Sequence, residues 1–354
     1  MLRLTVIGMI GQVVIGGYPV QDKVPPTNAG WSTKVLHTIP DVPQKDRQGL
    51  PDFTQGFNNC NDKQVWGLSY DDGPNPATTP GLMKELDKRG NIKATFFVVG
   101  SRVIEHSQVL KDEFNAGHQI GLHTWSHPAL TTLSNDQIVS ELVWNALAVR
   151  SVIGVTPKYF RPPYGDIDVR VKAILDALGL TTVIWAVDSL DSAGSTQVAQ
   201  VIGDYASQHP NSGPISLEHD LFPTEADQAP GALDNIIAAG FKPKPIIECL
   251  NHVAPAYDEK FWDIVGINPD DLSPLSSSSH SIASSIVSLA SPSASIASTS
   301  LASAPTPTAN HSVPTASNST NITAGNSTAG KDASNAFGFS PRLFVSSLFV
   351  SLFL

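Results

Sequence analysis

The sequence predicts an α/β fold in which parallel strands and helices alternate around a closed or nearly closed barrel. Short apolar runs alternate with amphipathic stretches of helical period about seven times between residues 65 and 247. Such alternation is typical of a parallel sheet covered by helices, and the roughly 220–250 residues of folded composition suit one barrel domain. An open, doubly wound sheet is the alternative, but no Gly-x-Gly-x-x-Gly follows the first strand to indicate a nucleotide site.

The individual elements follow from the period of the apolar residues. The expected strands are residues 65–70, 94–99, 119–123, 159–161, 181–187 and 214–218, with a shorter one near 245–247. The expected helices are residues 81–89, 101–116, 135–153, 169–178, 197–208 and 232–239. Ser134 and Gln137 form a capping-box pair before the longest helix, and Gly90, Gly117 and Gly179 are typical helix ends.

The first residues have the composition of a secretory signal. Arg3 precedes an apolar run from Leu4 to Ile15, and Gly16 and Gly17 follow it. We therefore expect a signal peptide over residues 1–17, although a buried first strand or helix would also fit. Residues 18–59 would then be an N-terminal extension of the folded domain at 60–270.

Residues 271–330 differ in composition from the rest of the chain, because Ser, Ala, Thr, Pro and Asn dominate there. Such a segment buries too little apolar surface to offset the entropy of ordering it, so we expect a disordered stalk. Four Asn-x-Ser/Thr sequences within it predict a glycosylated stalk on a secreted protein. They begin at Asn310, Asn318, Asn321 and Asn326.

Residues 331–354 end in an apolar run from Leu343 to Leu354, which is short for a bilayer crossing. A polar spacer and small residues precede this run, and nothing follows it in the sequence. That order is the pattern of a GPI-attachment signal. The candidate attachment residues are Asn326, Gly330 and Ser334.

The cysteines and the net charge indicate the redox compartment and one class of partner that is not expected. Cys60 and Cys249 flank the predicted strands, and in an oxidising compartment a disulfide would join the ends of the domain. Two buried free thiols are the alternative, and we expect the bridge. The formal net charge of −10 argues against nucleic acid as a partner.

Two polar clusters follow neighbouring strands. Asp71 and Asp72 end the first strand before Gly73-Pro74, and two adjacent carboxylates need a cation to stay ionised together. His123 and His127 follow the third strand, four residues apart. One carboxylate and two neutral imidazoles make a common zinc set with positions left open. A polar surface turn and a chance pair of histidines are the alternatives for either cluster alone.

Further candidates follow the later strands. Arg161 can hold a carboxylate through paired hydrogen bonds, and the backbone N–H of Tyr164 could donate to an oxyanion. His219 is the remaining proton donor at a strand end, and an acidic neighbour such as Asp191 would raise its pKa. Four other histidines lack such company and are interpreted as structural or surface residues. These are His106, His118, His209 and His252.

In this order, the segments resemble the five motifs of the polysaccharide deacetylase family, carbohydrate esterase family 4. The resemblance covers about residues 65–220. Its motifs are Asp71-Asp72-Gly73-Pro74, His123-Thr-Trp-Ser-His127, Arg161-Pro-Pro-Tyr164, Asp188-Ser-Leu-Asp191 and Leu217-Glu-His219. It implies a distorted (β/α) barrel and a metal-dependent enzyme, with zinc or cobalt as cofactor, that removes N- or O-acetyl groups from polysaccharides.

The resemblance also implies a role for each matching residue. It assigns the metal to Asp72, His123 and His127. Asp71 matches the catalytic base, Arg161 the residue that orients the base, His219 the catalytic acid, and Asp191 the residue that tunes the acid. Tyr164 and Leu217 match positions beside the acetyl pocket.

One position departs from the family pattern. Ser192 stands directly after Asp191, where relatives often have a Trp that walls the pocket for the acetyl methyl group. The departure concerns the pocket and not the metal or the base. Trp185, on the fifth expected strand, is a candidate to replace part of that wall and to contact substrate.

With the stalk and the anchor signal, the resemblance implies a secreted enzyme of the cell wall and membrane surface that deacetylates chitin to chitosan and acetate. We expect a monomer that meets chitin or a related polysaccharide, and a membrane only through its lipid anchor. One alternative is a deacetylase of a galactosamine-containing glycan or of O-acetylated xylan. The other is a non-catalytic, wall-anchored chitin-binding protein.

Overall fold

The computed structural model describes residues 13–15, 17–42 and 52–272 of the 354-residue chain. Residues 1–12 of the expected signal peptide lie outside the described residues. So do the expected stalk from residue 273 onward, its four glycosylation sites, the three candidate attachment residues and the terminal apolar run.

Seven parallel strands form the central sheet of the described chain. Their spatial order is β8-β7-β6-β5-β4-β10-β9. The strands are β4 (Ser69–Asp71), β5 (Thr95–Val98), β6 (Gln119–Leu122), β7 (Tyr159–Phe160), β8 (Thr181–Thr182), β9 (Val187–Asp188) and β10 (Ser216–His219). Two smaller sheets pair β1 (Val13–Ile15) with β2 (Tyr18–Pro19) and β3 (Val65–Gly67) with β11 (Lys242–Lys244).

The two edge strands of the main sheet belong to a single stretch of chain. Between β8 and β9, the N–H of Ile184 donates to the carbonyl of Phe57 (2.8 Å), and the N–H of Ala186 donates to that of Ile215 (2.9 Å). The sheet therefore curls until its edges are nearly joined, which confirms the predicted barrel. One strand was expected over residues 181–187, but the structure has two short ones. The backbone pairs with β7 in β8 and with β10 in β9, so it changes partners between the two.

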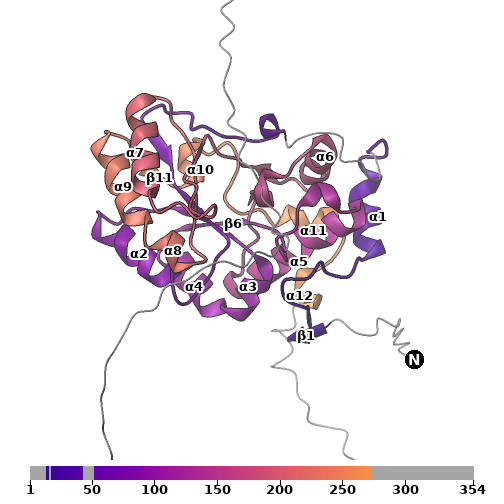
Figure 1. The fold of residues 1–354 in the computed structure, drawn as a ribbon. Helices are drawn as coiled ribbons and strands as arrows, with labels where there is room; N and C mark the ends of the chain where they lie inside the picture. The colour runs from indigo at the N-terminus through magenta and orange to yellow at the C-terminus, as the bar shows by residue number, and fades with distance from the viewer. Residues whose placement is uncertain (1–12, 16, 43–51, 273–354) are drawn as a thin grey trace, which may run out of the picture. The chain divides into compact units, whose positions relative to one another are not determined.

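Helices surround the curled sheet, with β6 near the middle of the view in Figure 1. The helices are α1 (Ala29–His37), α2 (Thr79–Lys88), α3 (Gly100–Glu105), α4 (Ser107–Asn115), α5 (Asn135–Ile153), α6 (Val169–Ala177), α7 (Val198–Gln208), α8 (Pro223–Ala226), α9 (Ala229–Ala238), α10 (Ile246–Cys249), α11 (Lys260–Val265) and α12 (Pro269–Leu272). Short 3₁₀ turns occupy Phe53–Gln55, Leu130–Thr132 and Pro163–Gly165. None of the helices in this described part combines the length and hydropathy that a bilayer crossing requires.

Most of the predicted helices are confirmed, together with their end signals. The longest, α5, has the predicted bounds, and both hydrogen bonds of the Ser134–Gln137 capping box are present. Gly90, Gly117 and Gly179 all have positive φ, which glycine adopts without steric cost. The helix expected over residues 101–116 is instead two helices, because the backbone leaves the helical region at His106 (φ −121°, ψ 39°).

The strand predicted near residues 245–247 is wrong, because Ile246–Cys249 form α10 and the strand lies just before it. A short apolar run does not distinguish a buried strand from a buried helix. In this chain, side chains of β5 and β6 accept hydrogen bonds from the first residues of α10 and so favour the helix. The hydroxyl of Thr95 accepts from the N–H of Ile246 and the amide oxygen of Gln119 accepts from the N–H of Ile247, both at 2.8 Å.

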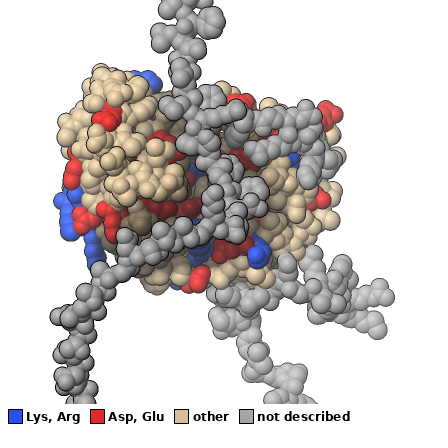
Figure 2. All heavy atoms as spheres, viewed as in Figure 1, with Lys and Arg blue, Asp and Glu red and all other residues tan. Residues whose placement is uncertain are grey.

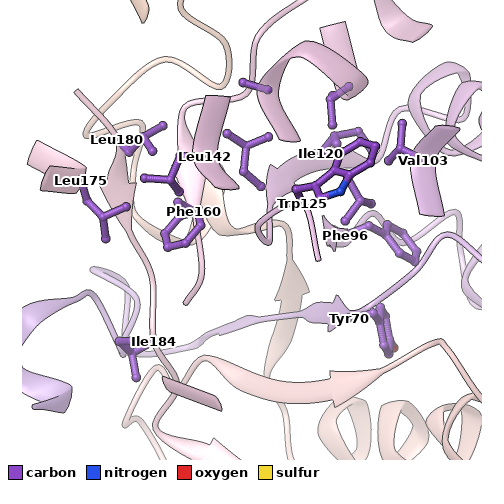
Figure 3. Close-up of a cluster of buried hydrophobic side chains, with 14 of the residues drawn as sticks. Tyr70, Phe96, Val103, Ile120, Trp125, Leu142, Phe160, Leu175, Leu180 and Ile184 are labelled. Carbon is purple, nitrogen blue, oxygen red and sulfur yellow. The ribbon is translucent and has the colours of Figure 1, made fainter. Parts of the chain in front are cut away.

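The core lies between the sheet and its helices and includes the side chains in Figure 3, among them Phe96, Ile120, Trp125, Leu142 and Phe160. Helix α5 is buried on most of its surface, which is expected of a helix that is apolar nearly all round.

The N-terminal extension adds aromatic side chains to this core. Tyr18 is 1% exposed and stacks on Trp125 with ring centroids 5.9 Å apart. Trp31 of α1 meets the edge of Trp144 at 5.5 Å. Residues 18–37 are therefore part of the folded domain rather than a tail before it.

The predicted disulfide between Cys60 and Cys249 is present, and both residues are 1% exposed. It joins positions 189 residues apart, so it restricts nearly the whole barrel in the unfolded chain. We expect the double variant Cys60→Ala/Cys249→Ala to lose about 2–5 kcal/mol of unfolding free energy, measured by urea denaturation. Adding reductant should lower the stability of the native protein and leave that of the variant unchanged; an equal response of the two proteins would contradict the prediction.

Candidate active site

The predicted site residues meet at one end of the barrel. Asp71 is the last residue of β4 and His219 the last of β10, and these two residues are register partners on adjacent parallel strands. His123 directly follows β6, and Arg161 directly follows β7. The carboxyl ends of parallel strands lie at one end of the barrel, which is called the rim here. All of these side chains therefore lie at the rim.

Three of these side chains form a cluster suited to a metal ion. One ligand atom each from Asp72, His123 and His127 lies within 4.8 Å of the others. Oδ1 of Asp72 is 3.1 Å from Nε2 of His127 and 3.4 Å from Nε2 of His123. The three residues predicted as ligands are therefore brought together.

The hydrogen bonds of this cluster fit a cation. Nδ1 of His123 lies 2.7 Å from the carbonyl oxygen of Arg161, so that nitrogen donates and Nε2 keeps its lone pair for a ligand. Oδ1 of Asp72 is buried and has no hydrogen-bond partner among the described residues. Burial, followed by the neighbouring His123, lowers the pKa of His127 to about 4, so its ring is neutral at physiological pH. An unpartnered carboxylate oxygen beside two imidazoles fits a divalent metal such as zinc.

Several residues in and beside the segments that carry these ligands have a strained backbone. Asp72 (φ 80°), Thr124 (φ 67°), His127 (φ 59°) and Tyr164 (φ 60°) all lie in the left-handed region although none is glycine. Each such residue costs on the order of 1–3 kcal/mol and persists only where neighbours hold it. The surrounding side chains must therefore hold the turn at Asp72 and the histidine loop, defined here as residues 123–127.

Asp220 holds the turn at Asp72, and sequence reasoning gives it no role. It is fully buried, its Oδ1 accepts from the N–H of Gly73 at 3.0 Å, and Oδ2 accepts from the hydroxyl of Thr79. A Cβ at Gly73 would lie 2.6 Å from both Asp220 carboxylate oxygens, which explains why glycine occupies this position. The position of Asp220 directly after His219 was the available signal.

Asp71 forms a buried ion pair with Arg161. Nη1 of Arg161 lies 2.8 Å from Oδ1 of Asp71, and the two side chains are 0% and 1% exposed. The guanidinium also lies 4.5 Å from the centroid of the Phe97 ring and donates to the carbonyl of Ile184 at 3.3 Å. The ion pair with Arg161 fixes the carboxylate of Asp71. The other oxygen of that carboxylate, Oδ2, lies 3.8 Å from Nε2 of His123, at the edge of the metal cluster.

Asp191 and His219 form the second predicted pair. Oδ1 of Asp191 accepts from Nδ1 of His219 at 2.7 Å, and Oδ2 accepts from the backbone N–H of His219, also at 2.7 Å. Burial disfavours the charged imidazole, but the hydrogen bond and the charge of Asp191 outweigh it and raise the pKa of His219 to about 10. The ring is therefore a protonated donor at neutral pH.

The raised pKa of His219 predicts a pH-dependent contribution to stability. A raised folded-state pKa stabilises the protein below the unfolded value of about 6.5, and this stabilisation is lost as pH rises through about 10. In the metal-free protein, we expect Asp191→Asn to lower the unfolding free energy most near pH 6 and progressively less toward pH 10. Urea denaturation at several pH values measures this. A difference that stays constant from pH 6 to pH 10 would mean that Asp191 does not set this pKa.

The predicted substrate-contacting residues differ in how far their side chains are exposed and in which residues they contact. Tyr164 is 64% exposed, and its hydroxyl lies 3.1 Å from Nδ1 of His127. Leu217 is buried on β10. Trp185 packs against the ring of Phe53 (centroids 5.4 Å apart) and lies beside Arg161, while Ser192 is exposed. The rim thus offers an exposed aromatic side chain next to the metal cluster.

The four histidines interpreted above as structural or surface residues lie outside this group. Nδ1 of His118 accepts from the N–H of Ala94 at 3.2 Å, at the opposite end of β6 from His123. His106 is at the junction of α3 and α4, His209 follows α7, and His252 follows α10. None of them belongs to the metal cluster found among the described residues.

Comparison with known proteins agrees with this arrangement. The sequence model of the family described as polysaccharide deacetylase matches residues 58–183. The chain is 41% identical over 282 residues to chitin deacetylase 1 of Cryptococcus neoformans var. grubii, covering 67% of this chain and 59% of that protein. It is 34% identical to a chitin deacetylase of Amylomyces rouxii, covering 66% and 55%. The chain thus spans less than two thirds of the length of these curated relatives.

A solved structure shares the fold. The chitin deacetylase of Colletotrichum lindemuthianum superposes with a TM-score of 0.54 at 28% identity, over 57% of this chain and 95% of that one. The family match covers Asp71, Asp72, His123, His127 and Arg161, whereas Asp191 and His219 lie beyond its last residue. The chain therefore contains a polysaccharide deacetylase domain.

Proposed function

We propose that this protein is a metal-dependent chitin deacetylase that hydrolyses the N-acetyl groups of N-acetylglucosamine units to acetate and free amines. The observation that carries the proposal is the meeting of three groups at one rim. They are the Asp72–His123–His127 cluster, the Asp71–Arg161 ion pair and the Asp191–His219 pair. The names of the fungal relatives support chitin as the substrate.

In this proposal Asp72, His123 and His127 hold a zinc or cobalt ion. When bound, such an ion supplies a Lewis acid that polarises an acyl carbonyl and makes water more acidic. Two of these residues belong to the histidine loop and one to the turn held by Asp220.

The other two pairs move the protons of the reaction. Asp71, fixed by Arg161, accepts a proton from the water that attacks the amide carbon. His219, kept protonated by Asp191, donates a proton to the amide nitrogen as the C–N bond breaks, so that the amine can leave. One water is consumed, and acetate and a glucosamine unit are released. Tyr164 and Leu217 would line the pocket for the acetyl group, with Trp185 beside them.

One face of the described chain suggests the kind of substrate that it suits. On the face seen in Figure 2, residues other than Lys, Arg, Asp and Glu make up most of the visible described surface. A substrate recognised mainly by its charge would require a dense patch of opposite sign. Neutral sugar units with acetamide groups need none.

The test is acetate release from chitin oligomers by the purified protein, with chelation and add-back of zinc or cobalt. We expect release that is abolished by chelator and restored by the metal. A panel with O-acetylated xylan and a galactosamine-containing glycan separates the substrates. Protein that carries no metal and releases no acetate after metal addition would exclude the enzyme and favour a non-catalytic binding protein.

We further propose that the protein is secreted as a monomer and held at the membrane and wall by a lipid anchor after a glycosylated stalk. The sequence patterns at residues 1–17, 271–330 and 331–354 support this. Release of the protein from fungal membranes by a phosphatidylinositol-specific phospholipase tests the anchor.

A further inference from the structure

The histidine loop is bound from behind by one helix of the barrel wall. Helix α5 presents Glu141 and Asn145, four residues apart and therefore on one face, toward the loop. Both side chains are 0% exposed, although the helix is otherwise mostly apolar. Two buried polar residues in such a helix need partners, and the histidine loop provides them.

Glu141 receives three hydrogen bonds from the loop. Its Oε2 accepts from the backbone N–H groups of Trp125 (2.8 Å) and Ser126 (2.9 Å), and its Oε1 accepts from the Ser126 hydroxyl (2.6 Å). These two N–H groups belong to residues between the two ligands, His123 and His127. The carboxylate therefore sets the path of the backbone from one ligand to the other.

Asn145 binds the start of the loop. Its Oδ1 accepts from the N–H of His123 at 3.0 Å, and its Nδ2 donates to the carbonyl of Val98 at 3.1 Å. The same carbonyl accepts from the N–H of His123. Asn145 thus ties the first ligand to the end of β5.

The opposite side of the loop is also held. The carbonyls of Thr124 and Trp125 accept from the N–H groups of Gly100 (2.9 Å) and Ser101 (3.0 Å) at the start of α3. A Cβ at Gly100 would lie 2.9 Å from the Cα of Asn145, so glycine lets α3 pack directly on α5. The loop contains two residues with positive φ, Thr124 and His127, and would not keep this shape without such contacts.

We propose that Glu141, together with Asn145, is a positioning residue that sets the separation and direction of the two histidine ligands. The inference rests on the proposed metal site, since it concerns how the protein shapes that site. Neither residue touches the reacting atoms; both act through the loop. A charged residue within the apolar sequence of residues 138–149 is the sequence signal for this role.

Two substitutions at position 141 separate the loss of the charge from the loss of the hydrogen bonds. Glu141→Gln keeps an oxygen for the two N–H groups, and its amide can donate to the Ser126 hydroxyl. Glu141→Ala removes all three bonds. We expect Glu141→Ala to weaken zinc or cobalt affinity by about 10–100-fold, as is usual when groups behind metal ligands are lost. Glu141→Gln should stay within about threefold of the native affinity.

The matched control is Leu147→Ala, which shortens a buried side chain on the same helix. Leu147 is not one of the residues that form the hydrogen bonds to the loop described above. It should lower the melting temperature at least as much as Glu141→Ala while leaving metal affinity unchanged. Affinity is measured by titration calorimetry with each metal. Losses of affinity that follow melting temperature across all variants would overturn the proposal, as would equal losses for the Gln and Ala variants.

A second measurement needs no metal. In the metal-free protein, the amides of Trp125 and Ser126 should exchange with solvent at least tenfold faster in Glu141→Ala than in Glu141→Gln or Leu147→Ala. Unchanged protection in Glu141→Ala would overturn the inference even if the native protein binds no metal. Absence of metal binding by the native protein would instead count against the proposed function, so the two failures are distinguishable.

Discussion

Replacing Asp71 by Asn is expected to lower the rate of acetate release by about 10²–10⁴-fold, the usual contribution of a positioned general base. The amide cannot accept the proton of the attacking water, whereas Asp72, His123 and His127 are untouched. Metal content should therefore stay at the native level. The measurement is kcat on a chitin oligomer together with the metal bound per protein.

Stability should fall in the same variant. Arg161 would keep a hydrogen-bond acceptor but lose its countercharge while 0% exposed, and removing one partner of a buried pair costs up to about 3–5 kcal/mol. Asp234→Asn is the control, because it breaks an ion pair with Arg89 between α2 and α9, away from the rim. That variant should keep native kcat. Native turnover by folded, metal-loaded Asp71→Asn would remove Asp71 as the base.

Replacing His123 by Ala is expected to abolish activity through loss of the metal. Loss of a group behind a ligand already costs 10–100-fold in affinity, so loss of a ligand itself should exceed about 100-fold. Titration calorimetry with zinc and cobalt measures the affinity directly. Excess metal should restore little activity, in contrast with the chelated native protein.

His118→Ala is a matched control for this variant, because His118 is a buried histidine at the other end of β6. Burial lowers the pKa of His118 to about 4, so the ring of His118 is neutral at physiological pH. It should lose stability and keep its metal. Equal affinities for the His123→Ala and native proteins would show that the cluster is not the metal site.

Much of the fold could be predicted from the sequence, because local patterns decide local structure. The period of the apolar residues and the capping box defined α5 to the residue. The apolar run at residues 245–247 was assigned wrongly, because a short run carries no period and the hydroxyl of Thr95 and the amide of Gln119 selected a helix there. The sequence also gave no sign that Tyr18 and Trp31 would complete the core.

The residue types of the candidate site were likewise readable from the sequence. Carboxylates, imidazoles and a guanidinium at the ends of successive strands must share one rim if the sheet is parallel. The motif order then predicted which residues would be neighbours, and Asp72, His123 and His127 do lie together. Their roles in catalysis stay predictions until the variants above are measured.

What the sequence determined by itself is therefore the set of chemical groups and the edge of the sheet that carries them. The tertiary structure decided their distances. Asp71 and Arg161 belong to β4 and the end of β7, with β5 and β6 between them, about 14 Å apart in a flat sheet. The curl of the barrel, together with the length of the arginine side chain, leaves 2.8 Å between the carboxylate and the guanidinium. The support from Asp220 and Glu141 likewise depends on contacts between segments distant in sequence, which no local pattern encodes.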